Sequence, residues 1–186
     1  MNAPLFPLRR LTLHPGDVAC VDRGERLDTL LGSCVAILLT DPQRSVGAMC
    51  HVVHAGAPQG LPTRDTAYGD AALAEMIRLL RLRGIDQQQC LAWVYGGGNM
   101  FPARFGQTAA DGHVGAANFE WALGALHQAG IRVLGVALGG HAYRKLRWTV
   151  GPEAPEVETV SMTRPPVPPA REGTAAEAPK PVHARG

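Results

Sequence analysis

The feature that most limits how this chain of 186 residues can fold is a pair of short apolar runs separated by a turn. Val35 to Thr40 reads VAILLT and is rich in strand-forming residues, and Val46 to Val53 is a second extended run. The residues between them, Asp41-Pro42-Gln43-Arg44, are typical of turns. The pattern predicts a β-hairpin. In an antiparallel pair, Cys34 at the start of the first strand and His51 toward the end of the second would lie near each other.

Two later segments have the apolar spacing of helices that pack one face on a sheet, from Tyr68 to Leu82 and from Ala117 to Ala129. Each is followed by a glycine, a strand-like run and a glycine cluster, which suggests an internal duplication. The predicted later strands are Leu91 to Tyr95, Ile131 to Leu138, and a final hairpin of Lys145 to Val150 and Val157 to Met162. The fold class is therefore α/β or α+β, with two main helices covering a mixed β-sheet.

The length and composition predict one folded domain with loose ends. We expect residues 11–162 to fold, and residues 1–10, with two prolines and two arginines, to be loosely ordered. Residues 163–186 contain six prolines and almost no large apolar side chain. A disordered tail is therefore expected there.

Charge and cysteine content exclude some classes of protein. Residues 1–162 carry 14 basic and 14 acidic side chains, so the net charge of +2 lies in the tail, which argues against a nucleic-acid surface. No signal peptide and no apolar stretch of membrane-spanning length is present, so we expect no membrane insertion. The four cysteines, at 20, 34, 50 and 90, lack the spacing of a disulfide framework. These features favour a cytoplasmic protein.

Cys34 and His51 provide the two groups that a cysteine nucleophile needs at minimum, a thiol and an imidazole that can act as its base. A free thiol with a pKa near 8.5 is mostly protonated at neutral pH, and a neighbouring imidazole can take its proton. The small residues Gly32 and Ser33 let the backbone bend before Cys34, and a backbone N–H there can face a developing oxyanion. The competing interpretation is inert packing, because free cysteine is often buried.

Ordered blocks of residues resemble the chemoreceptor glutamine deamidase family, CheD. The resemblance extends from about His14 to about Val160. The blocks are Thr29-Leu30-Leu31-Gly32-Ser33-Cys34-Val35-Ala36, Gly47-Ala48-Met49-Cys50-His51, Gly96-Gly97-Gly98-Asn99-Met100-Phe101, Val114-Gly115-Ala116-Ala117-Asn118, and Gly139-Gly140 followed by Arg144.

The resemblance implies a layered sandwich fold and a protein-glutamine glutaminase that converts receptor glutamines to glutamates through a cysteine thioester. The matching nucleophile is Cys34 and the matching general base and acid is His51. The implied substrates are the cytoplasmic helices of methyl-accepting chemoreceptors, and a CheC-type phosphatase is an implied partner. We expect no cofactor. We also expect Gly32, Ser33 and Asn99 to contact the oxyanion or the substrate.

The residue that orients His51 is left open by the sequence. Family members carry a threonine six residues before the cysteine, where this chain has Asp28, with Thr29 next to it. The carboxylate of Asp28 can orient an imidazole, as in catalytic triads. Thr29 would supply the hydroxyl after a shift of one residue, which in a regular strand turns the side chain to the opposite face. Asp28 is alternatively a solvated residue at a strand edge.

Two other functions compete with the deamidase. One is a non-catalytic chemotaxis adaptor that binds receptors or the phosphatase. The other is a metal-binding hydrolase, since Cys50, His51 and His54 include good zinc ligands. Residues 51 and 54 would face opposite sides of a strand, and no second close ligand pair follows, so no metal is expected.

Overall fold

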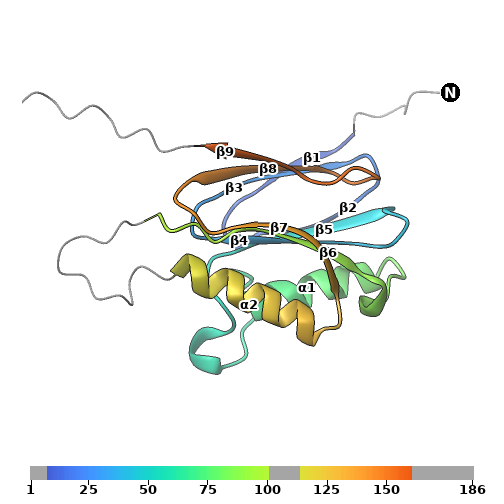
Figure 1. Ribbon diagram of the computed structural model, residues 1–186. Coiled ribbons are helices and arrows are strands. Elements are labelled where there is room, and N and C mark those ends of the chain that lie inside the picture. The colour runs from blue at the N-terminus through green and yellow to red at the C-terminus, as the bar shows by residue number, and fades with distance from the viewer. Residues whose placement is uncertain (1–7, 101–113, 161–186) are drawn as a thin grey trace, which may run out of the picture.

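The computed structural model describes residues 8–100 and 114–160, which form three layers (Figure 1). One layer is a four-stranded sheet in the order β1-β3-β8-β9, and the middle layer is a five-stranded sheet in the order β2-β5-β4-β6-β7. Two α-helices form the third layer, beneath the middle sheet (Figure 1). The predicted mixed α+β layered sandwich is confirmed.

The bounds of the elements follow the chain in order. The strands of the first half are β1 (Arg10–Leu13), β2 (Val18–Asp22), β3 (Arg26–Leu31), β4 (Val35–Thr40) and β5 (Val46–Val52). The second half holds α1 (Gly69–Arg81), β6 (Leu91–Gly96), α2 (Val114–Gln128), β7 (Arg132–Leu138), β8 (Tyr143–Thr149) and β9 (Glu156–Val160), and the short 3-10 helices are η1 (Pro58–Gly60) and η2 (Gln87–Gln89). Neither described α-helix is long and apolar enough to cross a membrane.

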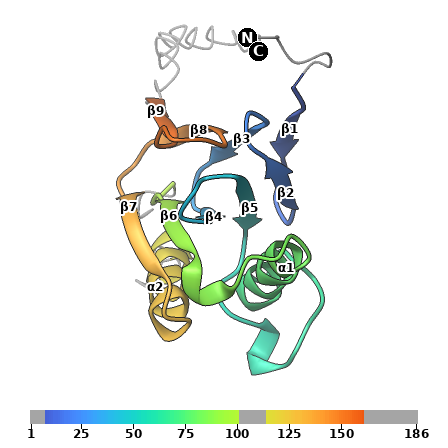
Figure 2. The ribbon, with the colours of Figure 1, turned by 90° about the vertical axis from the view of Figure 1, so that its right-hand side faces the viewer.

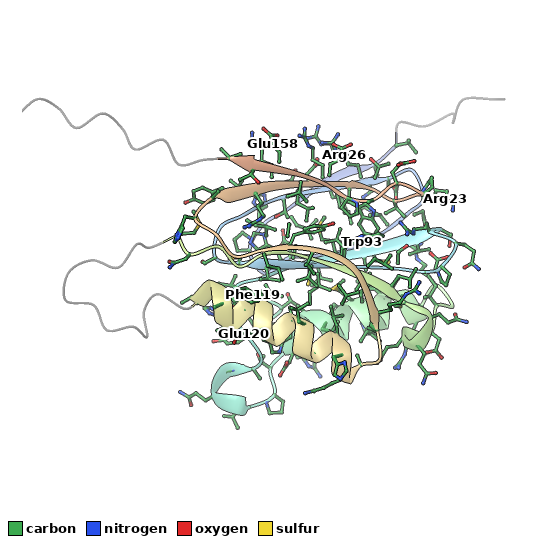
Figure 3. The ribbon with its side chains drawn as sticks, viewed as in Figure 1. Arg23, Arg26, Trp93, Phe119, Glu120 and Glu158 are labelled. Atoms are coloured by element: carbon green, nitrogen blue, oxygen red, sulfur yellow. The ribbon has the colours of Figure 1, made fainter. Side chains whose placement is uncertain are left out.

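The predicted central hairpin is the pair β4 and β5, which is antiparallel and buried along its whole length. Its apolar residues are continuous because the middle sheet is covered on both faces. Alternate residues such as Ile37 and Cys50 face the helices, whereas Leu38 and Met49 face the four-stranded sheet. Figure 3 shows Trp93 between the two sheets and Phe119 between α2 and the middle sheet. Two separate apolar cores result.

The two helix-strand units lie side by side, with β6 and β7 paired in parallel and both helices under the same sheet (Figure 2). The predicted helix at 68–82 is observed at 69–81, and the one predicted from residue 117 begins three residues earlier, at Val114. The final hairpin is β8 and β9.

The structure also contains strands that the sequence does not predict. Residues 10–31 form β1, β2 and β3. β1 and β3 lie in the four-stranded sheet, and β2 lies at one edge of the five-stranded sheet. Arg10, at the edge of the segment predicted to be loose, belongs to β1. Residues 1–7, 101–113 and 161–186 lie outside the described residues, so the loose N-terminus up to residue 7, the last residues of the final hairpin and the tail at 163–186 stay predictions.

Candidate active site

Cys34 and His51 lie on the same face of the middle sheet. Cys34 follows the turn at Gly32 and Ser33 and directly precedes β4, and His51 in β5 pairs with Ala36. Cys34 is therefore two residues along its strand from the direct partner of His51, so the two are diagonal neighbours. Cys34 is half-buried against the core between the two sheets. The register places the thiol and the imidazole in the same inter-sheet space.

A hydrogen bond between the two sheets orients His51. The hydroxyl Oγ1 of Thr29, in β3, lies 2.9 Å from Nδ1 of His51 and donates to the backbone carbonyl of Leu13 at 2.8 Å. A hydroxyl has a single proton, so Nδ1 must donate to Thr29. This leaves the lone pair on Nε2, which is buried and bonded to no described residue. Nε2 is thus the nitrogen available to accept a proton.

Asp28 points away from His51. It lies on the outer face of the four-stranded sheet, where its carboxylate pairs with Arg10 at 2.5 Å and Arg26 at 2.8 Å. Figure 3 shows Arg26 on this outer surface. Successive side chains of a strand face opposite sides, so only one of the two adjacent residues can reach the inter-sheet space. Of the two residues left open by the sequence, the structure brings Thr29 to His51.

Burial favours the uncharged forms of both reactive groups. It raises the pKa of the Cys34 thiol, and the residue's own backbone N–H only partly offsets this. Burial likewise lowers the pKa of His51 below its ordinary 6.5, against opposing effects of the Leu13 carbonyl and Asp17. At neutral pH both shifts favour a neutral thiol and a neutral imidazole. Such a pair can transfer its proton as the sulfur attacks.

The glycine cluster at 96–98 holds the turn that carries Cys34. The amide of Gly97 donates to the Cys34 carbonyl at 2.8 Å, and the amide of Gly98 donates to the Gly32 carbonyl at 2.8 Å. Gly96 has a φ of +114°, and a Cβ there would collide with the Cys34 carbonyl. These glycines therefore allow two backbone segments to approach closely.

Two further loops meet this turn. Asn99 donates from its backbone amide to the Gly140 carbonyl at 2.7 Å, so it contacts the second glycine cluster. A Cβ at Gly32 would lie 3.1 Å from both the Met100 and Tyr143 side chains. The rim around Cys34 thus comes from segments 32–34, 96–100 and 139–143.

Two polar residues that support the site have no role predicted from the sequence. The side-chain amide of Asn118, in α2, donates to the carbonyls of Ser33 and Val53. The guanidinium of Arg144, in β8, donates to the Gly139 carbonyl at 2.6 Å. In the sequence, the sign that could have drawn attention to Asn118 is a single amide side chain in the otherwise apolar stripe of a helix.

The residues weighed as metal ligands do not form a cluster. Cys50 faces the helices, opposite to His51, and burial raises the pKa of its thiol to about 12. His54 contacts Tyr68 in a tilted arrangement, with their ring centroids 4.9 Å apart. Within residues 8–100 and 114–160, no three His, Cys, Asp or Glu side chains come close enough to hold a metal ion.

The sequence comparisons with known proteins agree on one family. A family model described as "CheD chemotactic sensory transduction" matches residues 54–155, more than half of the chain. The "Probable chemoreceptor glutamine deamidase CheD 2" of Albidiferax ferrireducens is 39% identical over 140 residues, which cover 74% of this chain and 80% of that protein. The "Probable chemoreceptor glutamine deamidase CheD" of Pseudomonas savastanoi pv. phaseolicola is 34% identical over 150 residues, which cover 78% and 81%.

Solved structures are more distant. The Bacillus licheniformis hypothetical protein YfiH has a TM-score of 0.40 and 17% sequence identity, over 65% of this chain and 50% of that one. The family is therefore defined by the sequence relatives. At 39% identity to a curated relative over most of both chains, and with a matching family model, this chain belongs to the CheD family.

Proposed function

We propose that this chain is a chemoreceptor glutamine deamidase in which Cys34 is the nucleophile and His51 is the general base and acid. Thr29 orients the imidazole. The observation that carries the proposal is the hydrogen bond from His51 to Thr29, which leaves Nε2 without a described hydrogen-bond partner in the inter-sheet space that Cys34 also borders. The curated relatives, each named a probable chemoreceptor glutamine deamidase, supply the substrate class.

The first half of the reaction forms a thioester. Sγ of Cys34 attacks the side-chain amide carbon of a glutamine as Nε2 of His51 takes the thiol proton. Backbone N–H groups of the turn at Gly32, Ser33 and Cys34 stabilise the oxyanion of the tetrahedral intermediate. The carbon–nitrogen bond then breaks, and His51 returns its proton to the departing ammonia.

The second half restores the enzyme. His51 takes a proton from water, the water oxygen attacks the thioester carbon, and the bond to sulfur breaks as the proton passes to Cys34. The sum is glutamine and water giving glutamate and ammonia. These steps use only side chains and backbone of the chain, so the proposed reaction takes place without a cofactor.

The proposed substrate surface is the helical cytoplasmic part of a chemoreceptor. Segments 96–100 and 139–143 meet the turn at residues 32–34, which supports the proposal that they form the surface that the receptor contacts. A CheC-type phosphatase is a second proposed partner. The proposed location is the cytoplasm, because a reactive thiol survives in a reducing compartment.

The test is incubation of a chemoreceptor cytoplasmic fragment with the wild type and with Cys34→Ala, followed by peptide mass spectrometry. The proposal predicts the mass gain of glutamine to glutamate at specific positions with the wild type alone. Equal conversion by both proteins would contradict the role of Cys34, and no conversion by either would contradict the activity.

The non-catalytic adaptor is separated from the enzyme by a binding measurement on the same proteins. If Cys34→Ala binds the receptor fragment as tightly as the wild type but releases no ammonia, binding and catalysis are both properties of this chain. An adaptor alone would bind, and neither protein would release ammonia.

A further inference from the structure

Asn118 occupies a place in α2 that helices usually give to an apolar residue. The buried residues of α2 follow one stripe, which consists of Gly115, Asn118, Ala122 and Leu126. Asn118 is 1% exposed. A buried amide is unfavourable unless it is hydrogen-bonded, so its partners indicate what it does there.

Both recorded partners of Asn118 adjoin the proposed catalytic residues. Its Nδ2 donates one proton to the carbonyl of Ser33, at 3.1 Å, and the other to the carbonyl of Val53, at 3.0 Å. Ser33 immediately precedes Cys34, and Val53 follows His51 by two residues. One side chain therefore connects the turn before the proposed nucleophile to Val53, which directly follows β5, the strand that carries the proposed base.

The bond to Ser33 determines the direction of the next backbone N–H. The described chain has no cis peptide bond, and in a trans peptide the C=O and N–H point in opposite directions. The Ser33 carbonyl points toward α2 in the helix layer, so the N–H of Cys34 points away from that layer. The backbone N–H of Cys34 also partly offsets the burial that raises the pKa of its thiol.

We propose that Asn118 is a positioning residue that holds the Ser33–Cys34 peptide so that the N–H of Cys34 faces the reacting sulfur and the oxyanion. The oxyanion part rests on the proposed deamidase function. The part that concerns the sulfur does not, because it depends only on the direction of one N–H.

Three variants in the full chain test this inference. Asn118→Ala removes both hydrogen bonds, and Asn118→Ser keeps one hydroxyl proton and is the milder change. Trp121→Phe is the matched control, because it removes a hydrogen bond from α2 to Asp70, of 2.9 Å, that does not involve the nucleophile turn. Urea unfolding of each variant shows how much of any effect comes from lost stability, and rates are taken per folded protein.

The first readout is ammonia release from a receptor fragment. Asn118→Ala is expected to lower kcat by roughly tenfold to a hundredfold with KM within about twofold, because a transition-state donor is misdirected. Asn118→Ser should fall between Asn118→Ala and the wild type, and Trp121→Phe should stay near the wild type. A kcat of Asn118→Ala close to that of the wild type, or an equal loss in Trp121→Phe, would overturn the inference.

The second readout works even if the wild type releases no ammonia. Iodoacetamide alkylation of Cys34, followed by peptide mapping across a range of pH, reports the thiolate fraction. Without the N–H facing the sulfur, the pH midpoint of alkylation should rise in Asn118→Ala and, less, in Asn118→Ser, and stay in place in Trp121→Phe. An unchanged midpoint in both Asn118 variants would overturn the inference independently of the deamidase function.

Discussion

At the scale of single residues, Thr29 and its neighbour Asp28 differ in the direction of their side chains. Thr29 bonds to His51 across the inter-sheet space, and Asp28 pairs with two arginines on the outside. Thr29→Val should lower kcat by roughly tenfold to a hundredfold, because an imidazole without its partner samples other orientations and tautomers. Thr29→Ser keeps the hydroxyl and should retain most activity.

Asp28→Asn is the control for this prediction, measured by the same ammonia assay. It removes a charge next to Thr29 without touching the inter-sheet space, so kcat should stay within about twofold of the wild type. A large loss in Asp28→Asn together with an active Thr29→Val would assign the orienting role to the carboxylate.

The acid side of the pH profile depends on His51. The proposed mechanism needs the neutral imidazole of His51, and burial lowers the pKa of this residue below 6.5. His51 therefore stays neutral to lower pH than a solvent-exposed histidine. The prediction is that kcat/KM, which reports the free enzyme, falls on the acid side with an apparent pKa below 6.5. A midpoint above that value, in protein shown by circular dichroism to be folded, would contradict it.

The sequence predicts the nearness of Cys34 and His51 better than the residues that support them. Cys34 and His51 lie at recognisable places in one local hairpin, so a pattern in neighbouring residues suffices. The choice between Asp28 and Thr29 depends on which face of β3 is buried, and that is set by how the four-stranded sheet packs on the middle sheet. Asn118 contacts the turn from a helix 85 residues away in sequence. Long-range contacts of this kind leave no local pattern.

At the scale of single elements, Asp41 fixes the turn between β4 and β5. Its carboxylate accepts hydrogen bonds from the amides of Ser45 and Val46, at 2.7 and 3.0 Å, and from the Ser45 hydroxyl at 2.9 Å. Asp41→Ala removes all three and should lower the free energy of unfolding by about 1–3 kcal/mol at neutral pH. Urea denaturation measures this change.

The contribution of Asp41 should depend on pH. Burial alone would raise the pKa of this carboxyl, but the bonds from Val46 and Ser45 outweigh it and hold the pKa below 3.8. Its stabilisation is then full above pH 3.8 and is lost as the pH falls through the lower, folded-state value. Asp41→Asn keeps the acceptor of both amides and should lose less than Asp41→Ala, without this acid dependence. Equal stability of Asp41→Ala and the wild type at neutral pH would contradict the assignment.

The elements differ in how well the sequence predicts them. The two helices and β4 to β9 have long apolar periodicity or runs bounded by glycine and proline, so their positions follow from local pattern to within a few residues. The strands β1 to β3 include charged residues that interrupt an apolar pattern, namely Arg10 in β1, Asp22 in β2, and Arg26 and Asp28 in β3. Their extended form comes from pairing with β5 and β8 in the folded protein.

At the scale of the whole molecule, the two sheets meet closely at Gly47. A Cβ at this position would overlap the ring of Trp148 and the side chain of Val150, which both belong to the core between the sheets. Gly47→Ala should therefore lower the free energy of unfolding by about 1–3 kcal/mol, because the sheets must separate to admit a methyl group. The measurement is urea denaturation.

Gly124→Ala is the matched control for the same substitution in open space. No atom lies within 4 Å of a Cβ built at Gly124, inside α2. Alanine is the better helix former, so this variant should be more stable than the wild type by about 0.5–1 kcal/mol. A Gly47→Ala variant at least as stable as the wild type would contradict the close approach of the sheets at Gly47.

The number of layers is the feature of the whole molecule that sequence patterns predict least well. Both faces of the middle sheet are apolar, which indicates cover on each side, but the cover on one side is a second sheet assembled from the first and last strands of the described chain. The candidate active site lies between those sheets. Its complete set of residues therefore exists only once both ends of the domain have come together.

The central claim is that Cys34 forms a thioester with the substrate glutamine. The direct measurement is the intact mass of the protein after an acid quench during turnover of a receptor-derived glutamine peptide. We expect an adduct equal to the peptide minus ammonia, mapped to Cys34, present in the wild type and absent in Cys34→Ala. Continued deamidation by Cys34→Ala at the wild-type rate, with no adduct on Cys34 in either protein, would contradict the account.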